Sequence, residues 1–349
     1  ADGVGYTFAT LEDAISAAAT GDTVTLLGNV TVDSTIDVEK AIDLDLGGFT
    51  VASTIEEGET ESKPVFCFSR VRGDVTIGNG TIAAKGTALE FAGGSLMGAA
   101  TYTLASDLTV TSEASAIFAH GGLKLVSSAT VESVGAAILT HGSKSGITNI
   151  NITGGSLTST NSVAMYLPQK NGTINISGGT ITGKTGIEIR NGTLNITGGE
   201  IIATGAELVT VPNGSGSTVN SGAAVAISKY TGSINSLKVN ISGGTLKGVY
   251  AVYEANLNPD SAEIAVDKMT VVLSDGTFDG AVESENLTAF ITGGRYASQP
   301  AEDYFDPDYI AAYRDGWFVP VESSALRAAQ TDGQAEGRMY GGVVGGRAA

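Results

Sequence analysis

The sequence predicts an all-β protein: a single-stranded parallel β-helix of about 12 coils with a short N-terminal capping helix and an aromatic-rich C-terminal cap. The first observation behind this prediction is a recurring phrase, Asn-Ile followed by Ser or Thr and two glycines. Full copies begin at residues 151, 175, 195 and 240, and weaker ones occupy 273–276 and 291–294. The period is roughly 22 residues with one doubled step, and so short a repeat must stack on its neighbours to bury a core.

Composition is the second observation. Charged residues make up only 16% of the 349 residues, and glycine occurs 48 times. Between the glycines, apolar and polar residues alternate, as in Ile42–Leu46. Alternation with period two is typical of strands that bury one face, and a chain so poor in charge is not expected to be disordered.

The first predicted element is a helix within an N-terminal capping segment, residues 1–22. Thr10 is suited to cap it, and Asp13 stands three residues further on, the spacing of a capping box. Four apolar residues then share one helix face: Leu11, Ala14, Ile15 and Ala18. Gly21 ends the helix, which we expect to cover the open apolar end of the first coil.

Residues 23–297 are predicted to form the β-helix itself. A second row of apolar segments lies between the Gly-Gly phrases, so each coil has at least two strands, joined by glycine-containing corners. The members of this second row are 88–91, 116–119, 137–140, 163–167, 186–189, 224–227 and 250–253.

Equivalent residues of the repeat are expected to stack from coil to coil. The isoleucines should point inward, and the asparagines should form an outward amide ladder. The residues of this structural repeat are Asn151, Ile152, Gly154, Asn175, Ile176, Gly178, Asn195, Ile196, Gly198, Asn240, Ile241 and Gly243. Two alternatives concern the same face: glycosylation at Asn-x-Ser/Thr sequons, and ice binding by a flat Thr/Asn surface. The loops 209–221 and 256–262 interrupt the stack and therefore disfavour ice binding.

The C-terminal part reads differently from the coils. Residues 298–322 are rich in aromatic side chains and are predicted to form a C-terminal cap. Residues 323–349 form a tail rich in Gly and Ala, with a short strand candidate at Met339–Gly346. We expect such a strand either to lie along its own β-helix or to add to the edge of a neighbouring molecule, and the second option gives head-to-tail self-assembly through this tail.

Two of these segments carry a family resemblance. The opening Thr10–Ile15 with Gly21–Val24 resembles the N-terminal cap of right-handed parallel β-helix proteins of the pectate-lyase-like superfamily. The coils that close with Ile291–Tyr296 resemble repeats in exported surface and adhesin-type proteins of Gram-positive bacteria. The resemblance implies a right-handed helix and a secreted or cell-surface location. It implies no single activity, because the superfamily includes lyases, hydrolases and non-catalytic adhesins.

Charge and cysteine content bear on partners and location. The net charge of −18 and the lack of a basic stripe make nucleic acid a poor partner, and the sequence contains no apolar run of membrane-spanning length. The sequence begins with Ala1 and not with an initiator methionine, as a chain does after a signal peptide has been removed. This favours an extracellular location. Cys67, between Phe66 and Phe68, is expected to be a buried, inert thiol.

Catalytic constellations are hard to assemble from this sequence. His120 and His141 are its two histidines and should stack on adjacent rungs. Glycoside hydrolysis needs two carboxylates that flank the scissile bond, and between Glu113 and Lys184 the one acid is Glu132. We therefore expect no enzyme activity, no cofactor and no metal site. A carbohydrate-active β-helix enzyme, lyase or hydrolase, is the alternative.

The second strand row is where we expect a ligand to bind. Polar and aromatic residues recur there, and tyrosines on a β-surface suit carbohydrate or protein contacts. The candidates for this binding face are Glu90, His120, His141, Tyr166, Glu188, Arg190, Tyr250 and Tyr253, with Lys229, Tyr230 and Glu254 beside them. The predicted function is that of a non-catalytic exported surface protein, structural or adhesin-like, whose partner is a glycan or a host cell-surface protein.

Overall fold

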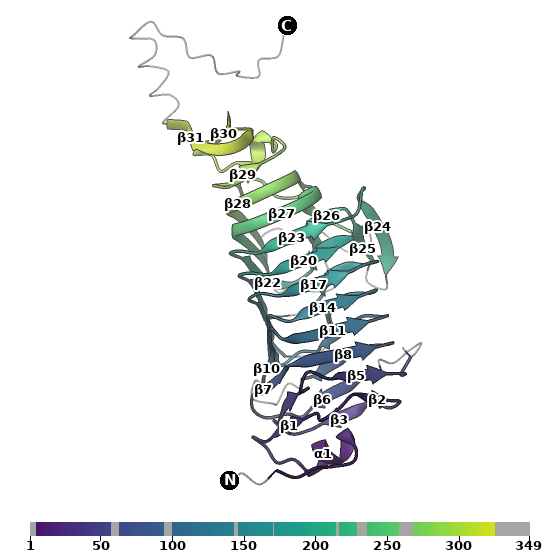
Figure 1. The fold of residues 1–349 in the computed structure, drawn as a ribbon. Helices are drawn as coiled ribbons and strands as arrows, with labels where there is room; N and C mark the ends of the chain where they lie inside the picture. The colour runs from purple at the N-terminus through teal and green to yellow at the C-terminus, as the bar shows by residue number, and fades with distance from the viewer. Residues whose placement is uncertain are drawn as a thin grey trace, which may run out of the picture.

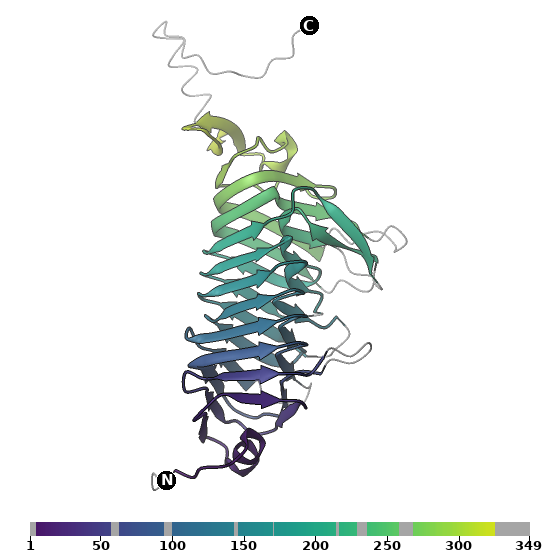
Figure 2. The ribbon, with the colours of Figure 1, turned by 45° about the vertical axis from the view of Figure 1, so that its right-hand side comes forward.

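A computed structural model shows an elongated parallel β-helix (Figure 1). The structure describes residues 5–56, 63–93, 100–142, 146–169, 171–213, 216–228, 236–257 and 268–324. Helix α1 lies at one end of the rod and the hairpin of β30 and β31 at the other, and both views show the strands stacked as rungs between them (Figures 1 and 2).

Three parallel sheets, here called A, B and C, form the walls of the helix. Sheet A contains β1 (Thr23–Thr25), β4 (Asp43–Asp45), β7 (Val75–Gly78), β10 (Ala100–Leu104), β13 (Leu123–Ser127), β16 (Thr148–Ile152), β19 (Thr173–Ile176), β22 (Gly192–Ile196) and the first parts of the long strands β27 (Leu237–Ala255) and β28 (Met269–Ser284).

Sheet B follows sheet A in every coil. It contains β2 (Val30–Val32), β5 (Thr50–Ser53), β8 (Gly80–Ala84), β11 (Leu108–Ser112), β14 (Thr130–Ser133), β17 (Ser156–Ser159), β20 (Thr180–Gly183), β23 (Glu200–Ala203), the middle of β27 and β28, and β29 (Arg295–Tyr296).

Sheet C closes the coil. It contains β3 (Ile36–Val38), β6 (Phe66–Ser69), β9 (Leu89–Ala92), β12 (Ile117–Ala119), β15 (Ile138–Thr140), β18 (Val163–Leu167), β21 (Thr185–Ile189), β26 (Ala223–Ser228) and the last parts of β27 and β28.

Each coil thus has three strands, where the sequence predicted at least two. Ten coils carry all three strands in the described part of the chain, and an eleventh is formed only by an Ile291 bridge and β29. This is fewer than the predicted 12, because an antiparallel hairpin, β24 (Val209–Asn213) and β25 (Gly216–Ser221), is inserted between β23 and β26 and lengthens one coil.

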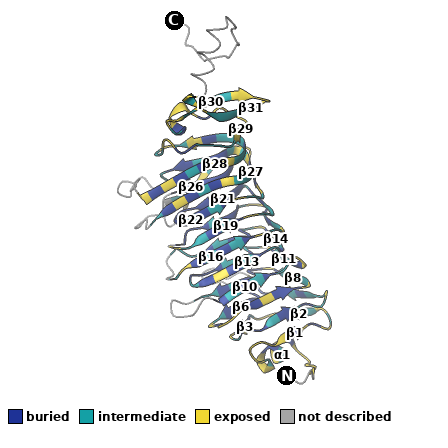
Figure 3. Cartoon of the chain, turned by 90° about the vertical axis from the view of Figure 1, so that its left-hand side faces the viewer, coloured by how far each residue is buried: buried dark blue, intermediate teal, exposed yellow. Residues whose placement is uncertain are grey.

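The inward residues form one continuous core along the rod. Figure 3 shows buried residues alternating with more exposed ones along the strands. The predicted isoleucine stack is confirmed: Ile152, Ile176, Ile196 and Ile241 pair in register on consecutive coils, each at most 1% exposed.

The second glycine of the repeat makes the corner between sheets A and B. Gly155 has a φ of +69°, and a Cβ built there would lie 2.1 Å from the carbonyl oxygen of Ala129 on the coil below. A side chain is therefore excluded both by the backbone conformation and by the close approach of the neighbouring coil.

The N-terminal helix caps the rod as predicted. Helix α1 spans Leu11–Ala17, and the Thr10 hydroxyl accepts a hydrogen bond of 3.1 Å from the Asp13 amide. Leu11 and Ile15 are buried against the first coil. The described residues include no helix long and apolar enough to cross a membrane.

The C-terminal end is covered by a short 3₁₀ turn, η2 (Glu302–Tyr304), and by the hairpin of β30 (Tyr309–Arg314) and β31 (Trp317–Glu322). Tyr304 packs on Phe290 with ring centroids 5.0 Å apart. Strand β31 pairs antiparallel with β29, so β29, β31 and β30 extend sheet B beyond the last coil. Of the predicted tail, residues 325–349 lie outside the described residues.

Candidate functional site

The outer face of sheet A carries the predicted amide ladder. Asn175 donates to Asn151, Asn195 to Asn175 and Asn240 to Asn195, at 2.8, 2.8 and 2.9 Å between Nδ2 and Oδ1. Each of the two central amides is bonded on both sides, so the ladder is a structural feature that joins four coils.

The outer face of sheet B is a ladder of hydroxyl side chains. One column reads Thr50, Thr81, Thr109, Thr130, Ser156, Thr180, Glu200, Thr245 and Thr277. Glu200 and, in the neighbouring column, the exposed Glu132 place charges in this face. The β24–β25 hairpin meets sheet C instead, so within the described residues of sheet B it is these carboxylates that break the regularity an ice surface requires.

The outer face of sheet C differs from the other two because it carries rings. Phe118 and Tyr166 lie in one outward column, and His120 and His141 lie at the adjoining ends of β12 and β15. We call these four residues the aromatic strip. The ring centroids of His120 lie 4.3 Å from Phe118 and 5.7 Å from His141, which confirms the predicted stacking of the two histidines.

Glu90 contacts the aromatic strip through His120. Its Oε1 atom lies 2.9 Å from Nε2 of His120, and the two side chains are 16% and 10% exposed. Nδ1 of His120 is buried and has no hydrogen-bond partner among the described residues. The carboxylate therefore fixes the orientation of the imidazole ring, as carboxylate partners of histidine commonly do.

Cys67 lies beside Glu90 in the register of sheet C. It is half-buried and faces outward, because Phe66 and Phe68 alternate with it and take the inward positions. The expectation of a buried thiol was therefore wrong as to full burial. Partial burial, with the nearby Glu90 and Asp37 carboxylates, raises the pKa of the thiol to about 11, so it is protonated at neutral pH and is not a nucleophile.

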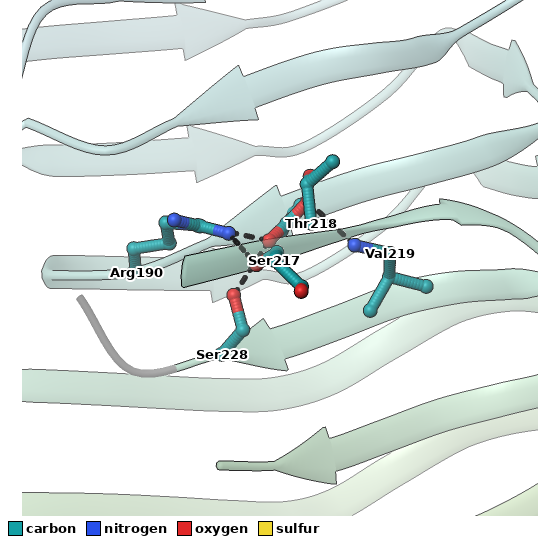
Figure 4. Close-up of polar contacts among 6 residues, drawn as sticks. Arg190, Ser217, Thr218, Val219 and Ser228 are labelled. Carbon is teal, nitrogen blue, oxygen red and sulfur yellow. Dashed lines mark hydrogen bonds and ion pairs between the residues drawn. The ribbon is translucent and has the colours of Figure 1, made fainter. Parts of the chain in front are cut away.

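Glu188 and Arg190 are not part of an accessible face, contrary to the sequence prediction. Both side chains are fully buried, because the β24–β25 hairpin folds back over this part of sheet C. Figure 4 shows Ser217, Thr218 and Val219 of β25 converging on the site together with Ser228. The donors to the Glu188 carboxylate are Nε of Arg190 at 2.9 Å, Oγ of Ser228 at 2.6 Å, the amide of Val219 at 3.2 Å and Oγ1 of Thr218.

Arg190 links the hairpin to the aromatic strip. Its Nη2 donates to the carbonyl oxygen of Ser217, and its Cζ lies 5.4 Å from the ring centroid of Tyr166. Nη1 is buried, and the part of the chain that the structure describes offers it no hydrogen-bond partner. The cation is thus neutralised by Glu188 and covered, and its role is to hold the hairpin in place.

The hairpin also has a small apolar core of its own. Val219, Ala223 and Ala226 are fully buried there, and Tyr250 and Tyr253 pack against them. Burial raises the pKa of Tyr253. Glu254 is also buried and accepts hydrogen bonds from Ser284 and Asn286, while Lys229 and Tyr230 lie outside the described residues. The partly exposed remainder of the predicted face is Glu90, His141, Tyr166, Tyr250 and Tyr253, and the predicted His120 is buried.

A groove of about 440 Å³ runs along the corner between sheets B and C. Its floor consists of small side chains, including Ala52, Ala84 and Ser112, and the exposed carboxylates of Glu113 and Glu132 line it. The sequence prediction noted both acids but not that adjacent coils bring them to one groove. The sequence did not reveal the third strand of each coil. The positions of Glu113 and Glu132 relative to that strand, and hence the groove, could therefore not be predicted.

No family model, no curated protein and no solved structure matches the chain. Within the described part of the chain, no group of three or more His, Cys, Asp or Glu side chains is arranged to hold a metal ion. The aromatic strip with its Glu90–His120 pair is the candidate functional site.

Proposed function

We propose that the protein is a non-catalytic, exported bacterial surface protein whose rod presents the aromatic strip to a ligand. The observation that carries the proposal is the difference between the three faces. Sheet A presents an amide ladder that bonds along the rod and sheet B presents a column of hydroxyl side chains, whereas sheet C carries the rings of Phe118, His120, His141 and Tyr166. Rings fixed on a rigid sheet suit binding with little loss of conformational entropy.

A glycan or a cell-surface protein is the proposed partner. Sugar rings stack their C–H faces on aromatic side chains, and aromatic residues are also favoured at protein–protein hot spots. The net charge of −18 disfavours polyanionic partners through repulsion. The resemblance to exported β-helix proteins of Gram-positive bacteria supports the surface location, and head-to-tail assembly through residues 323–349 stays a prediction because most of that segment lies outside the described residues.

The test is binding to a glycan array and to host cells by the full chain and by a variant with Phe118→Ala and Tyr166→Ala. We expect the double variant to lose at least tenfold in affinity, about 1.4 kcal/mol. Thr180→Ala and Thr182→Ala on sheet B are the matched control and should leave binding unchanged. Equal binding by all three proteins would contradict the proposal.

The groove favours one alternative, a carbohydrate-active enzyme, because Glu113 and Glu132 provide the two carboxylates that glycoside hydrolysis needs. The test is turnover of a panel of polysaccharides by the native chain and by Glu113→Gln and Glu132→Gln variants. Turnover lost in both variants would establish the alternative, and no turnover by the native chain would favour the binding role.

A further inference from the structure

The C-terminal end of the rod carries an open sheet edge. Strand β30 pairs with β31 and with no other described strand, so it is the last rung of the extended sheet B. It exposes Ile310 by 39% and Tyr313 by 66%. Natural proteins blunt such edges with central charges, prolines or bulges, and the stretch Tyr309–Tyr313 contains none of these.

The backbone groups of β30 that face outward can be assigned from its partner strand. Ala311 lies opposite Pro320, and proline has no N–H to donate, so this is a non-hydrogen-bonded pair. The Ser323 amide donates to the Asp308 carbonyl oxygen at 2.8 Å, which places the even-numbered residues at the bonded positions. The N–H and C=O groups of Ala311 and Tyr313 therefore point away from β31, toward the free edge.

We propose that two copies of the chain pair antiparallel through β30, edge to edge, as a tip-to-tip dimer with two-fold symmetry. In an antiparallel pair related by a two-fold axis, residues directly opposite share a sheet face, so the axis passes midway between one residue of the strand and its own copy. This restricts the register to two central choices, with Ala311 or with Ala312 on the axis.

The side chains distinguish these two registers. With Ala311 on the axis, Asp308 lies opposite Arg314 of the second copy, Tyr309 opposite Tyr313, and Ile310 opposite Ala312. The dimer then gains two symmetry-related ion pairs and two aromatic pairs. Asp308 and Arg314 are both exposed. With Ala312 on the axis, Ile310 would face Arg314 and Tyr309 would face Asp315. Charge complementarity therefore selects the register centred on Ala311.

The same register pairs three of the four free backbone groups, and the Tyr313 carbonyl oxygen is the exception because the Tyr309 amide opposite it donates to the Asp306 carbonyl oxygen. The Ala311 amides donate to each other's carbonyl oxygens across the axis, and each Tyr313 amide reaches the Tyr309 carbonyl oxygen of the second copy. Sheet B then continues from one rod into the other, and the two open edges cover each other. An isologous contact of this kind closes on itself and forms a dimer, not a filament.

One strand from each copy makes a small interface, so the dimer is expected to be weak, on the order of 10–100 µM. Sedimentation of the full chain up to high micromolar concentration should show a monomer–dimer equilibrium. Arg314→Asp places like charges opposite each other and should raise the dissociation constant by about tenfold or more. Asp308→Arg combined with Arg314→Asp exchanges the two charges and should restore the dimer.

A disulfide trap tests the register independently. In an Ala311→Cys variant, the two introduced thiols would meet on the axis at a Cα separation of about 5.5 Å, within the range that a disulfide bridges. Oxidation should give a covalent dimer. Ile310→Cys is the control, because each Ile310 faces Ala312 and the two copies of residue 310 do not meet. Three results would each overturn the proposal: a native chain that is monomeric at all concentrations, a dimer that Arg314→Asp leaves unaltered, or no cross-link at position 311. A monomer is also the result expected if another segment of the same chain covers the edge.

Discussion

At the scale of single residues, the buried Glu188 explains why part of the predicted binding face is inaccessible. Its carboxylate accepts hydrogen bonds from Arg190, from Ser228 of sheet C and from β25 of the hairpin. A buried carboxylate is costly unless its lone pairs are satisfied, and here the satisfying donors come from a segment about 30 residues later in the sequence. The ion pair with Arg190 therefore fixes the hairpin on the sheet.

Removing this carboxylate should release the hairpin. We expect Glu188→Ala to cost about 3–5 kcal/mol, because it leaves the Arg190 charge buried and unpaired. Amide hydrogen exchange should accelerate first in residues 216–221, where the Val219 amide loses its acceptor. The control is Glu132→Ala, an exposed glutamate on the same rod, which should change neither stability nor exchange. Unchanged protection of the hairpin in Glu188→Ala would contradict the assigned role.

The Cys67 thiol gives a pH-dependent prediction. Its pKa is raised from an ordinary value of 9.0 to about 11 by partial burial and by the carboxylates of Glu90 and Asp37. The folded state therefore holds the proton more tightly than the unfolded state. The resulting stability is fully present below pH 9 and is lost as the pH rises through 11. Alkylation of the folded protein by iodoacetamide should be slow at pH 8 and rise toward pH 11. A half-maximal rate near pH 9.0 would show an unperturbed thiol.

At the scale of elements, much of the structure is predictable because the repeat fixes the register. Ile152 and Ile176 occupy the same place in two phrases, so stacking the phrases necessarily stacks the side chains. The asparagines follow for the same reason. The burial of Glu188 was not predictable, because alternation correctly places it on the outer face of β21 but says nothing of a hairpin that returns to cover it. That contact depends on tertiary packing of Val219 against Ala226.

The amide ladder offers a graded test of stacking energy. Asn195 makes two amide bonds within the ladder, and Asn151, at its lower end, makes one. At about 1 kcal/mol for each hydrogen bond, Asn195→Ala should cost roughly twice as much as Asn151→Ala. Urea unfolding of both variants measures the difference. Equal losses would mean that packing of the asparagine side chains, not the bonds between them, supplies the stabilisation.

At the scale of the whole molecule, the two ends of the rod differ in how they are capped. Helix α1 covers the first coil with Leu11 and Ile15, each 5% exposed, so that end is closed by an apolar face. The other end finishes in β30, whose outer edge is open in the described part of the chain. The ends of a solenoid need caps to keep the molecule soluble, and this asymmetry makes the C-terminal end the expected site of association.

Detaching the N-terminal helix from the first coil should therefore expose a second end of the rod that is able to associate. Ile15→Asp places a charge at a buried position of α1, which we expect to detach the helix and expose the edge strands of the first coil. The variant should bind a hydrophobic dye and form larger, open-ended species in sedimentation, because an unpaired edge at each end permits continued addition. Ser16→Asp is the matched control, since Ser16 is exposed on the same helix and should leave the mass unchanged. If Ile15→Asp behaved like this control, the first coil would be protected by its own strands and the helix would not be needed as a cap.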